Sequence, residues 1–325
     1  MEWGFIILGI VVGAILFYFL IVYAVSVVHS RFFRKRFVPN PLIKTYSLDE
    51  NLYEQTVTIN HKRDLITGHF IYGKEYDNSK IVVFSHGIDS YYKSYMQEGN
   101  YLANHGFKVF MYDALGTGST SGFLDGLSNG PKTLDIVLKY LKAKYPDKKI
   151  ICVGHSWGAF SAINAGYENK VDKIVAISPF VSINRIIRDI SENILVKTLL
   201  GNTEIVEFIK CGKFAFSNSV KSLNRFKGKA LVIHSKDDYL ISYYKHMKYI
   251  MDHVKNNNVN YLVVDHKGHN PSYTEDGVTH LKDSFYKLNE LEGEEKEEYL
   301  KHCDFIAMGK LDERVMDQIV SFIRW

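Results

Sequence analysis

The sequence predicts an α/β protein with a mostly parallel central sheet that is covered by helices on both faces. Two observations predict this class. Short continuous apolar runs suit strands buried on both faces, and segments with helical spacing of apolar residues lie between them. The 325 residues are 46% hydrophobic and 23% charged, which is enough for a large core.

The strand and helix signals alternate from residue 56 onward. Each expected strand is a short apolar run, and each expected helix has apolar residues three or four apart. The expected strands are 56–60, 69–72, 81–87, 107–113, 149–154, 173–179, 229–235 and 260–266. The expected helices are 92–105, a helix around 134–141, 157–168, 242–254 and a last helix around 311–324.

The alternation fails between residues 180 and 228, which predicts an inserted cap. Apolar residues there recur near helical spacing, namely Ile183, Ile186, Ile187, Ile190, Ile194 and Leu195. Such a cap would suit either plain core packing or a lid over an acyl chain. The acidic stretch 290–302 is expected to be a solvated helix or loop.

The N-terminus predicts a membrane anchor. Residues 5–28 carry no charge, and a helix of that length spans a bilayer core of about 30 Å with some tilt. Arg31, Arg34, Lys35 and Arg36 follow at once, and such a basic flank stays cytoplasmic. We therefore expect a single-pass anchor over 1–30, a linker over 31–55 and a cytoplasmic domain over 56–325. Cleavage of the segment as a signal peptide after 24–26 is the alternative.

Composition excludes several classes of function. The net charge of +4, without a Lys/Arg stripe interleaved with stacking aromatic residues, argues against a nucleic-acid partner. Cys152, Cys211 and Cys303 are too widely spaced for a disulfide framework or a zinc site, and there is no HExxH motif. The glycines at 116–118 do not fit a dinucleotide fingerprint. We expect neither a metal nor a cofactor, and the oligomeric state stays open.

The run VGHSWGAF (153–160) contains the pattern G-x-S-x-G around Ser156. Ser156 follows an expected strand and precedes an expected helix, which is the context of a nucleophile elbow. Glycine is needed at 154 and 158 because a side chain there would collide with the neighbouring strand and helix. The backbone N–H of Trp157, at the helix N-terminus, could stabilise developing negative charge.

A serine nucleophile needs a base, and candidates follow in the order Ser, acid, His. Asp237 and Asp238 come just after one expected strand, and His266 and His269 come just after the next. In such sheets ligands bind at the carboxyl ends of the strands, so these loops meet at one edge. The run SHG (85–87) ends a further strand at this edge, and the N–H of the following residue, Ile88, is a second candidate oxyanion donor.

These motifs resemble those of the α/β-hydrolase superfamily. The similarity is greatest to its monoacylglycerol lipase-like and serine aminopeptidase-like group, especially membrane-anchored bacterial members. It covers about residues 56–280 and rests on SHG, DALGTGST (113–120), GHSWG, HSKDD and KGHN. The chain departs from the pattern at Ala159 and Ser235, where the family often has glycine.

The resemblance implies a catalytic triad of Ser156, Asp238 and His269. Asp238 is three residues after Ser235, as the family's acid is after its glycine, and Asp237 is the alternative. The expected activity is hydrolysis of a lipid-like carboxylic ester, such as a monoacylglycerol or lysophospholipid, through an acyl-enzyme on Ser156. A peptidase or amidase with the same triad, acyl transfer to an acceptor other than water, and a non-catalytic membrane-tethered binding protein are the alternatives.

Overall fold

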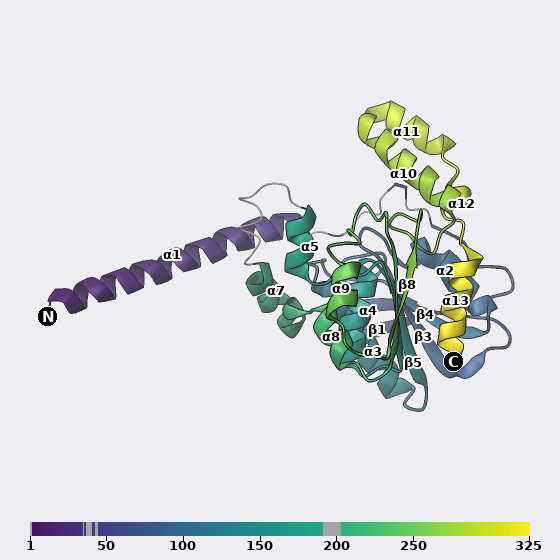
Figure 1. Ribbon diagram of the computed structural model, residues 1–325, viewed down its shortest axis with the longest axis horizontal. Coiled ribbons are helices and arrows are strands. Elements are labelled where there is room, and N and C mark those ends of the chain that lie inside the picture. The colour runs from purple at the N-terminus through teal and green to yellow at the C-terminus, as the bar shows by residue number, and fades with distance from the viewer. Residues whose placement is uncertain (1, 35, 37–40, 43–44, 191–202) are drawn as a thin grey trace.

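An eight-stranded sheet flanked by helices on both faces forms the core of the computed structural model (Figure 1). The structure describes residues 2–34, 36, 41–42, 45–190 and 203–325. The order of the strands in the sheet is β1-β2-β4-β3-β5-β6-β7-β8. The predicted fold class, an α/β protein with a mostly parallel sheet and an apolar helix before it, is confirmed.

In the described part of the sheet, the strands β4-β3-β5-β6-β7-β8 pair in parallel. The pairs β1 with β2 and β2 with β4 are antiparallel. The strands are β1 (Tyr53–His61), β2 (Asp64–Tyr72), β3 (Asp77–Ser85), β4 (Phe107–Tyr112), β5 (Lys149–His155), β6 (Lys173–Ile177), β7 (Lys229–Ser235) and β8 (Val259–Val264). Every predicted strand is present, with boundaries shifted by a few residues. The carboxyl ends of β3 and β5 to β8 therefore share one edge.

Two apolar cores lie on opposite faces of the sheet, as the alternation of side chains along a buried strand requires. In β3, Ile81 and Val83 face one core, while Val82 and Phe84 face the other. The first core is closed by α3 (Asn129–Lys144), α4 (Trp157–Glu168), α8 (Ser219–Arg225) and α9 (Met247–His253). The second is closed by η1 (Tyr92–Tyr95), α2 (Met96–Asn104) and α13 (Glu313–Arg324).

The region predicted as a cap is helical where the structure describes it. It contains α5 (Ile183–Ile190), α7 (Thr203–Cys211), η2 (Gly212–Phe216) and α8. Two of the residues cited for its helical spacing, Ile194 and Leu195, lie outside the described residues. The last of these helices, α8, packs on α4, where the Ser222 hydroxyl donates to Asn164 Oδ1 at 2.8 Å. This helix packs with the domain instead of covering the sheet edge.

A second helical insertion follows β8 and was not predicted. It contains α10 (Glu275–Glu290), α11 (Gly293–His302) and α12 (Phe305–Met308), and α10 and α11 stand out from the domain (Figure 1). None of the residues of α11 is buried, which agrees with the solvated helix expected for the acidic stretch. Residues of α10 and α12 reach the pocket described below, so the insertion also covers the site.

The N-terminal helix α1 (Glu2–Phe33) projects from the domain (Figure 1). Its segment Trp3–Arg31 is long and apolar enough to cross a membrane. Side chains are exposed along 3–20, whereas Val25 and His29 are buried against the domain. The helix therefore continues past the predicted boundary at residue 30 and ends in contact with the domain.

Candidate active site

Ser156 occupies the sharp turn between β5 and α4. Its backbone φ is 57° and its ψ is −118°, a strained conformation for a residue with a side chain. The Ser156 N–H donates to the Ile177 carbonyl at 2.8 Å, which holds the turn against β6. A Cβ at Gly158 would collide with the backbone of Ser85. The predicted strand-to-helix elbow is therefore present, and glycine is required for its close packing.

Asp238 and His269 form a buried pair at the ends of β7 and β8. His269 Nδ1 lies 2.9 Å from Asp238 Oδ2 and 3.1 Å from Oδ1. The Oδ1 atom also accepts the backbone N–H groups of Leu240 and Ile241 at 2.9 and 2.8 Å. Burial tends to raise the pKa of Asp238, but the charge of His269 and hydrogen bonds from His234 and His269 lower this pKa well below its usual range. Asp238 is thus held as a carboxylate facing the imidazole.

Asp237, the alternative acid, has a different set of partners. Its Oδ1 accepts the N–H groups of Lys267 and Gly268 at 3.2 and 3.1 Å and also binds the Ser235 hydroxyl. These bonds fix the loop that precedes His269. The structure therefore brings Asp238, and not Asp237, to the imidazole, while His266 is exposed at the end of β8.

The two predicted oxyanion donors belong to the loop after β3 and to the first turn of α4. Ile88 and Trp157 line the same pocket as Ser156 and His269. The loop that carries Ile88 is braced by His86, whose Nε2 accepts the N–H of Ala114 at 3.0 Å and whose Nδ1 donates to the Gly87 carbonyl at 2.7 Å. These two bonds require one neutral tautomer, and burial lowers the pKa of His86 in agreement with it.

A buried chain of hydrogen bonds joins this loop to the backbone of His269. The N–H of Gly87 donates to Tyr95 Oη at 3.1 Å, and that hydroxyl lies 2.8 Å from His155 Nδ1. His155 Nε2 lies 2.8 Å from the His269 carbonyl, so Nε2 carries the proton and Nδ1 accepts from the hydroxyl. Burial, followed by the charge of His269, lowers the pKa of His155 to about 3, so its ring is neutral at pH 7.

Sequence reasoning missed this chain. Neither His155 nor Tyr95 is among the residues that the sequence predicts for the site. Since hydrogen bonds between distant segments leave no periodic pattern, the histidine beside Ser156 was the one available signal.

Several of these residues line a cavity of about 460 Å³, within the usual range for small-molecule sites. Ser156, His155 and His269 form its polar part, together with Asn270 and the 87–89 loop. The rest is largely apolar and comes from three covers: the segment before β1, the region around α5, and α10 with α12. These covers contribute Leu42, Tyr46, Ile186, Ile190, Leu281, Phe285 and Met308. The cavity can hold an acyl chain beside Ser156.

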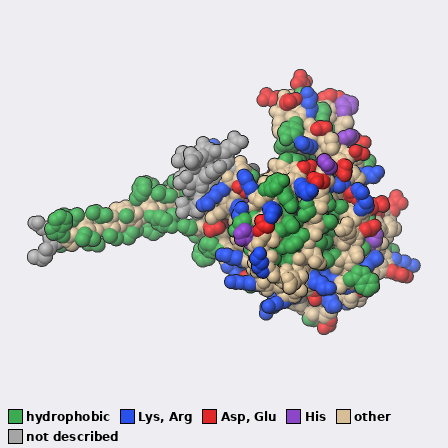
Figure 2. Space-filling view, viewed as in Figure 1, with side chains coloured by type: hydrophobic (Ala, Val, Ile, Leu, Met, Phe, Trp, Pro, Cys, Tyr) green, Lys and Arg blue, Asp and Glu red, His purple; other side chains and the backbone are tan. Residues whose placement is uncertain are grey.

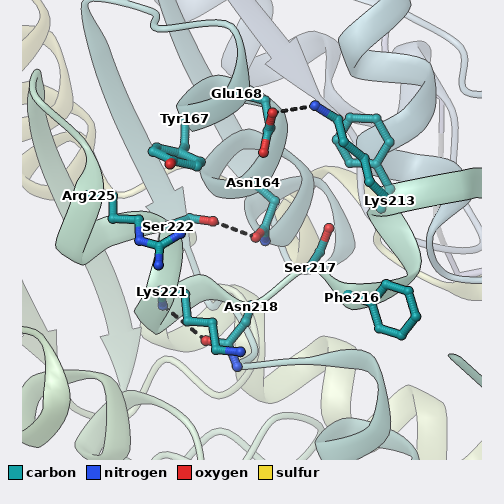
Figure 3. A pocket seen from close by; sticks show the side chains of 11 residues that line it. Asn164, Tyr167, Glu168, Lys213, Phe216, Ser217, Asn218, Lys221, Ser222 and Arg225 are labelled. Atoms are coloured by element: carbon teal, nitrogen blue, oxygen red, sulfur yellow. Dashed lines mark hydrogen bonds and ion pairs between the residues drawn. The ribbon is translucent and has the colours of Figure 1, made fainter.

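A smaller cavity of about 130 Å³ lies between α4, η2 and α8 (Figure 3). Its walls are polar: Lys213 pairs with Glu168, and Ser222 bonds to Asn164. None of the predicted site residues lines it. In the described part of the chain, no group of three or more His, Cys, Asp or Glu side chains could hold a metal ion.

Comparisons with known proteins find similarities in sequence and in fold. Residues 76–205 match the family described as serine aminopeptidase, S33. A solved esterase of Pyrococcus furiosus is 21% identical, with 80% of this chain and 99% of that chain covered and a TM-score of 0.56. Est1E of Butyrivibrio proteoclasticus, solved with ferulic acid bound, is 15% identical, with 71% and 98% covered and a TM-score of 0.53.

A third neighbour is a putative dipeptidyl aminopeptidase IV from Bacteroides ovatus. It is 15% identical, with 72% of this chain and 35% of that chain covered and a TM-score of 0.52. A comparison with curated protein sequences found no significant match.

The sheet order, the turn at Ser156 and these structural neighbours show that the chain has the α/β-hydrolase fold, as its motifs predicted. The matched segment 76–205, which includes Ser156, resembles the serine aminopeptidase family.

Proposed function

We propose that the chain is a serine hydrolase that cleaves a carboxylic ester through an acyl-enzyme on Ser156. The observation that carries the proposal is the buried contact of 2.9 Å between Asp238 and His269, beside Ser156 in one cavity. With Nδ1 directed at Asp238, His269 has Nε2 available to receive the proton of the Ser156 hydroxyl.

In the proposed reaction Ser156 Oγ attacks the acyl carbonyl carbon while His269 Nε2 takes the hydroxyl proton. The carboxylate of Asp238 stabilises the imidazolium that forms. The N–H groups of Trp157 and Ile88 donate to the oxyanion, and losing one such donor typically raises the barrier by about 3–4 kcal/mol. His269 then protonates the leaving alcohol. In the second half of the reaction His269 takes a proton from water, which attacks the acyl carbon, and His269 returns a proton to Ser156 Oγ as the acid leaves.

An apolar, lipid-like ester is the proposed substrate, of monoacylglycerol or lysophospholipid type. Support comes from the cavity, whose Ile186, Ile190, Leu281 and Phe285 suit an acyl chain better than a polar acid. The name of the Pyrococcus furiosus esterase, one of the structural neighbours, agrees with ester chemistry.

The acyl preference can be tested with p-nitrophenyl esters of increasing chain length. We expect kcat/KM to rise from acetyl to medium or long chains, since each buried CH₂ contributes about 0.8 kcal/mol. If esters of every length were inert while peptide amides were cleaved, the ester proposal would fail. The serine peptidase would then replace it, a second candidate favoured by the family match over 76–205.

We also propose that α1 anchors the domain to a membrane with the domain on the cytoplasmic side. The apolar length of Trp3–Arg31 and the basic residues Arg31, Arg34 and Arg36 support this orientation. Protease protection of sealed inside-out and right-side-out vesicles tests it: the domain should be digested only when the cytoplasmic face is outside.

A further inference from the structure

Helix α1 divides into a free part and a packed part. Along 3–20 its side chains are exposed, and apolar groups cover the visible side of the free part (Figure 2). At 1.5 Å per residue this part is about 27 Å long, close to the thickness of a bilayer core. Between Ile21 and Ser30 the burial rises on one side of the helix, where Val25 and His29 are buried and α1 packs on α7. The domain therefore begins at the level where a spanning α1 would leave the hydrocarbon.

Contacts from the end of α1 fix which side of the domain lies at that level. His29 Nε2 lies 3.3 Å from Glu207 Oε1, and both side chains are fully buried. Lys210 Nζ lies 3.4 Å from Ser30 Oγ. Glu207 and Lys210 belong to α7, so α7 must lie at the height of the last turns of α1.

Glu207 also contacts the wall of the cavity. The carboxylate of Glu207 accepts the N–H groups of Leu127 and Ser128 at 3.0 and 2.7 Å. Leu127 lines the cavity, and its carbonyl accepts the indole N–H of Trp157 at 2.6 Å. The end of α1, the helix α7 and the cavity wall are thus joined through one buried carboxylate.

Helix α7 exposes apolar side chains on the face turned away from the domain. Its inner face buries Val206 and Cys211 with Glu207, whereas Phe208 and Ile209 are 50% and 77% exposed. Phe216 is also exposed, and the centroid of its ring lies 5.5 Å from that of Phe208. We call Phe208 and Ile209, together with the half-buried Ile205 and with Phe216 of η2, the α7 apolar face. A surface helix normally turns polar residues outward, so this face suits an apolar environment.

Basic groups lie beside the α7 apolar face. Arg31 and Arg34 are exposed at the end of α1, and the Arg34 guanidinium lies 5.7 Å from the centre of the exposed Phe123 ring. Lys210 is next in α7 and pairs with Asp125 at 3.2 Å. Aromatic and basic side chains together are typical of the membrane interface, where cations meet anionic headgroups.

We propose that the α7 apolar face rests in the headgroup region of the bilayer that α1 spans, and that the cavity takes its acyl substrate from this bilayer. The inference depends on the proposed function and anchor. The cavity is bordered on this side by Ile186 and Ile190 of α5, which lies between α1 and the sheet in Figure 1. An acyl chain leaving the bilayer would therefore meet apolar side chains before reaching Ser156.

The depth of the face can be measured on the full chain in nanodiscs of phosphatidylcholine and phosphatidylglycerol. An NBD fluorophore is placed at Ile209→Cys in a Cys303→Ser background, because Cys152 and Cys211 are buried. The matched control is Ile306→Cys, because the Ile306 side chain is 73% exposed and its helix, α12, lies away from α1 in Figure 1. We expect doxyl-labelled lipid to quench the label at 209 but not at 306. Equal weak quenching at both sites, or a label at 209 shielded from both lipid and aqueous iodide, would overturn the proposal.

Substrate delivery is measured in a double variant that carries Phe208→Glu and Ile209→Glu, by comparing its hydrolysis rates for two esters. We expect hydrolysis of a monoacylglycerol in the disc to fall about tenfold, while p-nitrophenyl butyrate in water is cleaved at the wild-type rate. Ile306→Glu should change neither rate. An equal effect on both esters, or an effect on neither, would contradict delivery from the bilayer. If the wild type cleaved neither ester, the proposed function would fail, and the quenching result would still decide the docking.

Discussion

Asp238 and His269 are in direct contact, with 2.9 Å between the carboxylate Oδ2 and the imidazole Nδ1. The adjacent Asp237 instead accepts the backbone N–H groups that lead into His269. Two neighbouring aspartates thus have separate tasks: one orients the ring, and the other fixes the loop that carries it. This division gives the first prediction a matched control.

Asp238→Asn should lower kcat for ester hydrolysis by roughly 10³- to 10⁴-fold, because an amide in place of the carboxylate favours the wrong tautomer of His269. Asp237→Asn should cost less than about tenfold, since it weakens only the hydrogen bonds of the loop. Steady-state kinetics with one ester, alongside thermal melts of both variants, measures the difference. Equal losses in the two variants would mean that Asp238 has no special role.

Tyr95→Phe should reduce kcat by about tenfold and change KM by less than about twofold, because the Gly87 N–H and His155 Nδ1 lose a shared partner in a buried site. The oxyanion loop and His269 would then be less well positioned. Tyr112→Phe is the control, since it removes a buried hydroxyl that bonds to Ser85 at 2.7 Å. A change in KM alone, or equal effects of both variants, would count against a positioning role for Tyr95.

Glu98→Gln should make stability less dependent on pH. Burial raises the pKa of Glu98 from 4.5 to about 7 in the folded chain. Between these values the unfolded chain releases the proton and the folded chain keeps it, so stability falls as pH rises, by about 3 kcal/mol in all. Denaturant unfolding at pH 5 and pH 8 should show the variant more stable than the wild type at pH 8 only. A wild-type advantage at pH 8 would refute this account.

The sequence predicted the sheet and the position of Ser156 because both depend on local patterns. Continuous apolar runs identified each strand, and G-x-S-x-G after such a run identified the turn. The parallel sheet then brought the loops after β5, β7 and β8 to one edge. The choice of Asp238 over Asp237 rested on resemblance, and the structure places Asp238 next to His269.

Other parts of the site could not be predicted from local patterns. The helices α10 and α12 contribute Leu281, Phe285 and Met308 to the cavity. Apolar residues of α10 recur at helical spacing, but that spacing indicates only a helix and not the site against which it packs. The contact between His29 and Glu207 joins residues 178 positions apart. Such contacts depend on how separate elements dock, which neither composition nor spacing records.

The central claim is that Ser156 is an activated nucleophile. Labelling of the full chain with a fluorophosphonate measures this directly, with Ser156→Ala and His269→Ala beside the wild type. We predict that the wild type is labelled and that labelling is lost in Ser156→Ala and nearly lost in His269→Ala. Failure of the folded wild type to react, where a known serine hydrolase is labelled, would contradict the account and favour the non-catalytic binding protein.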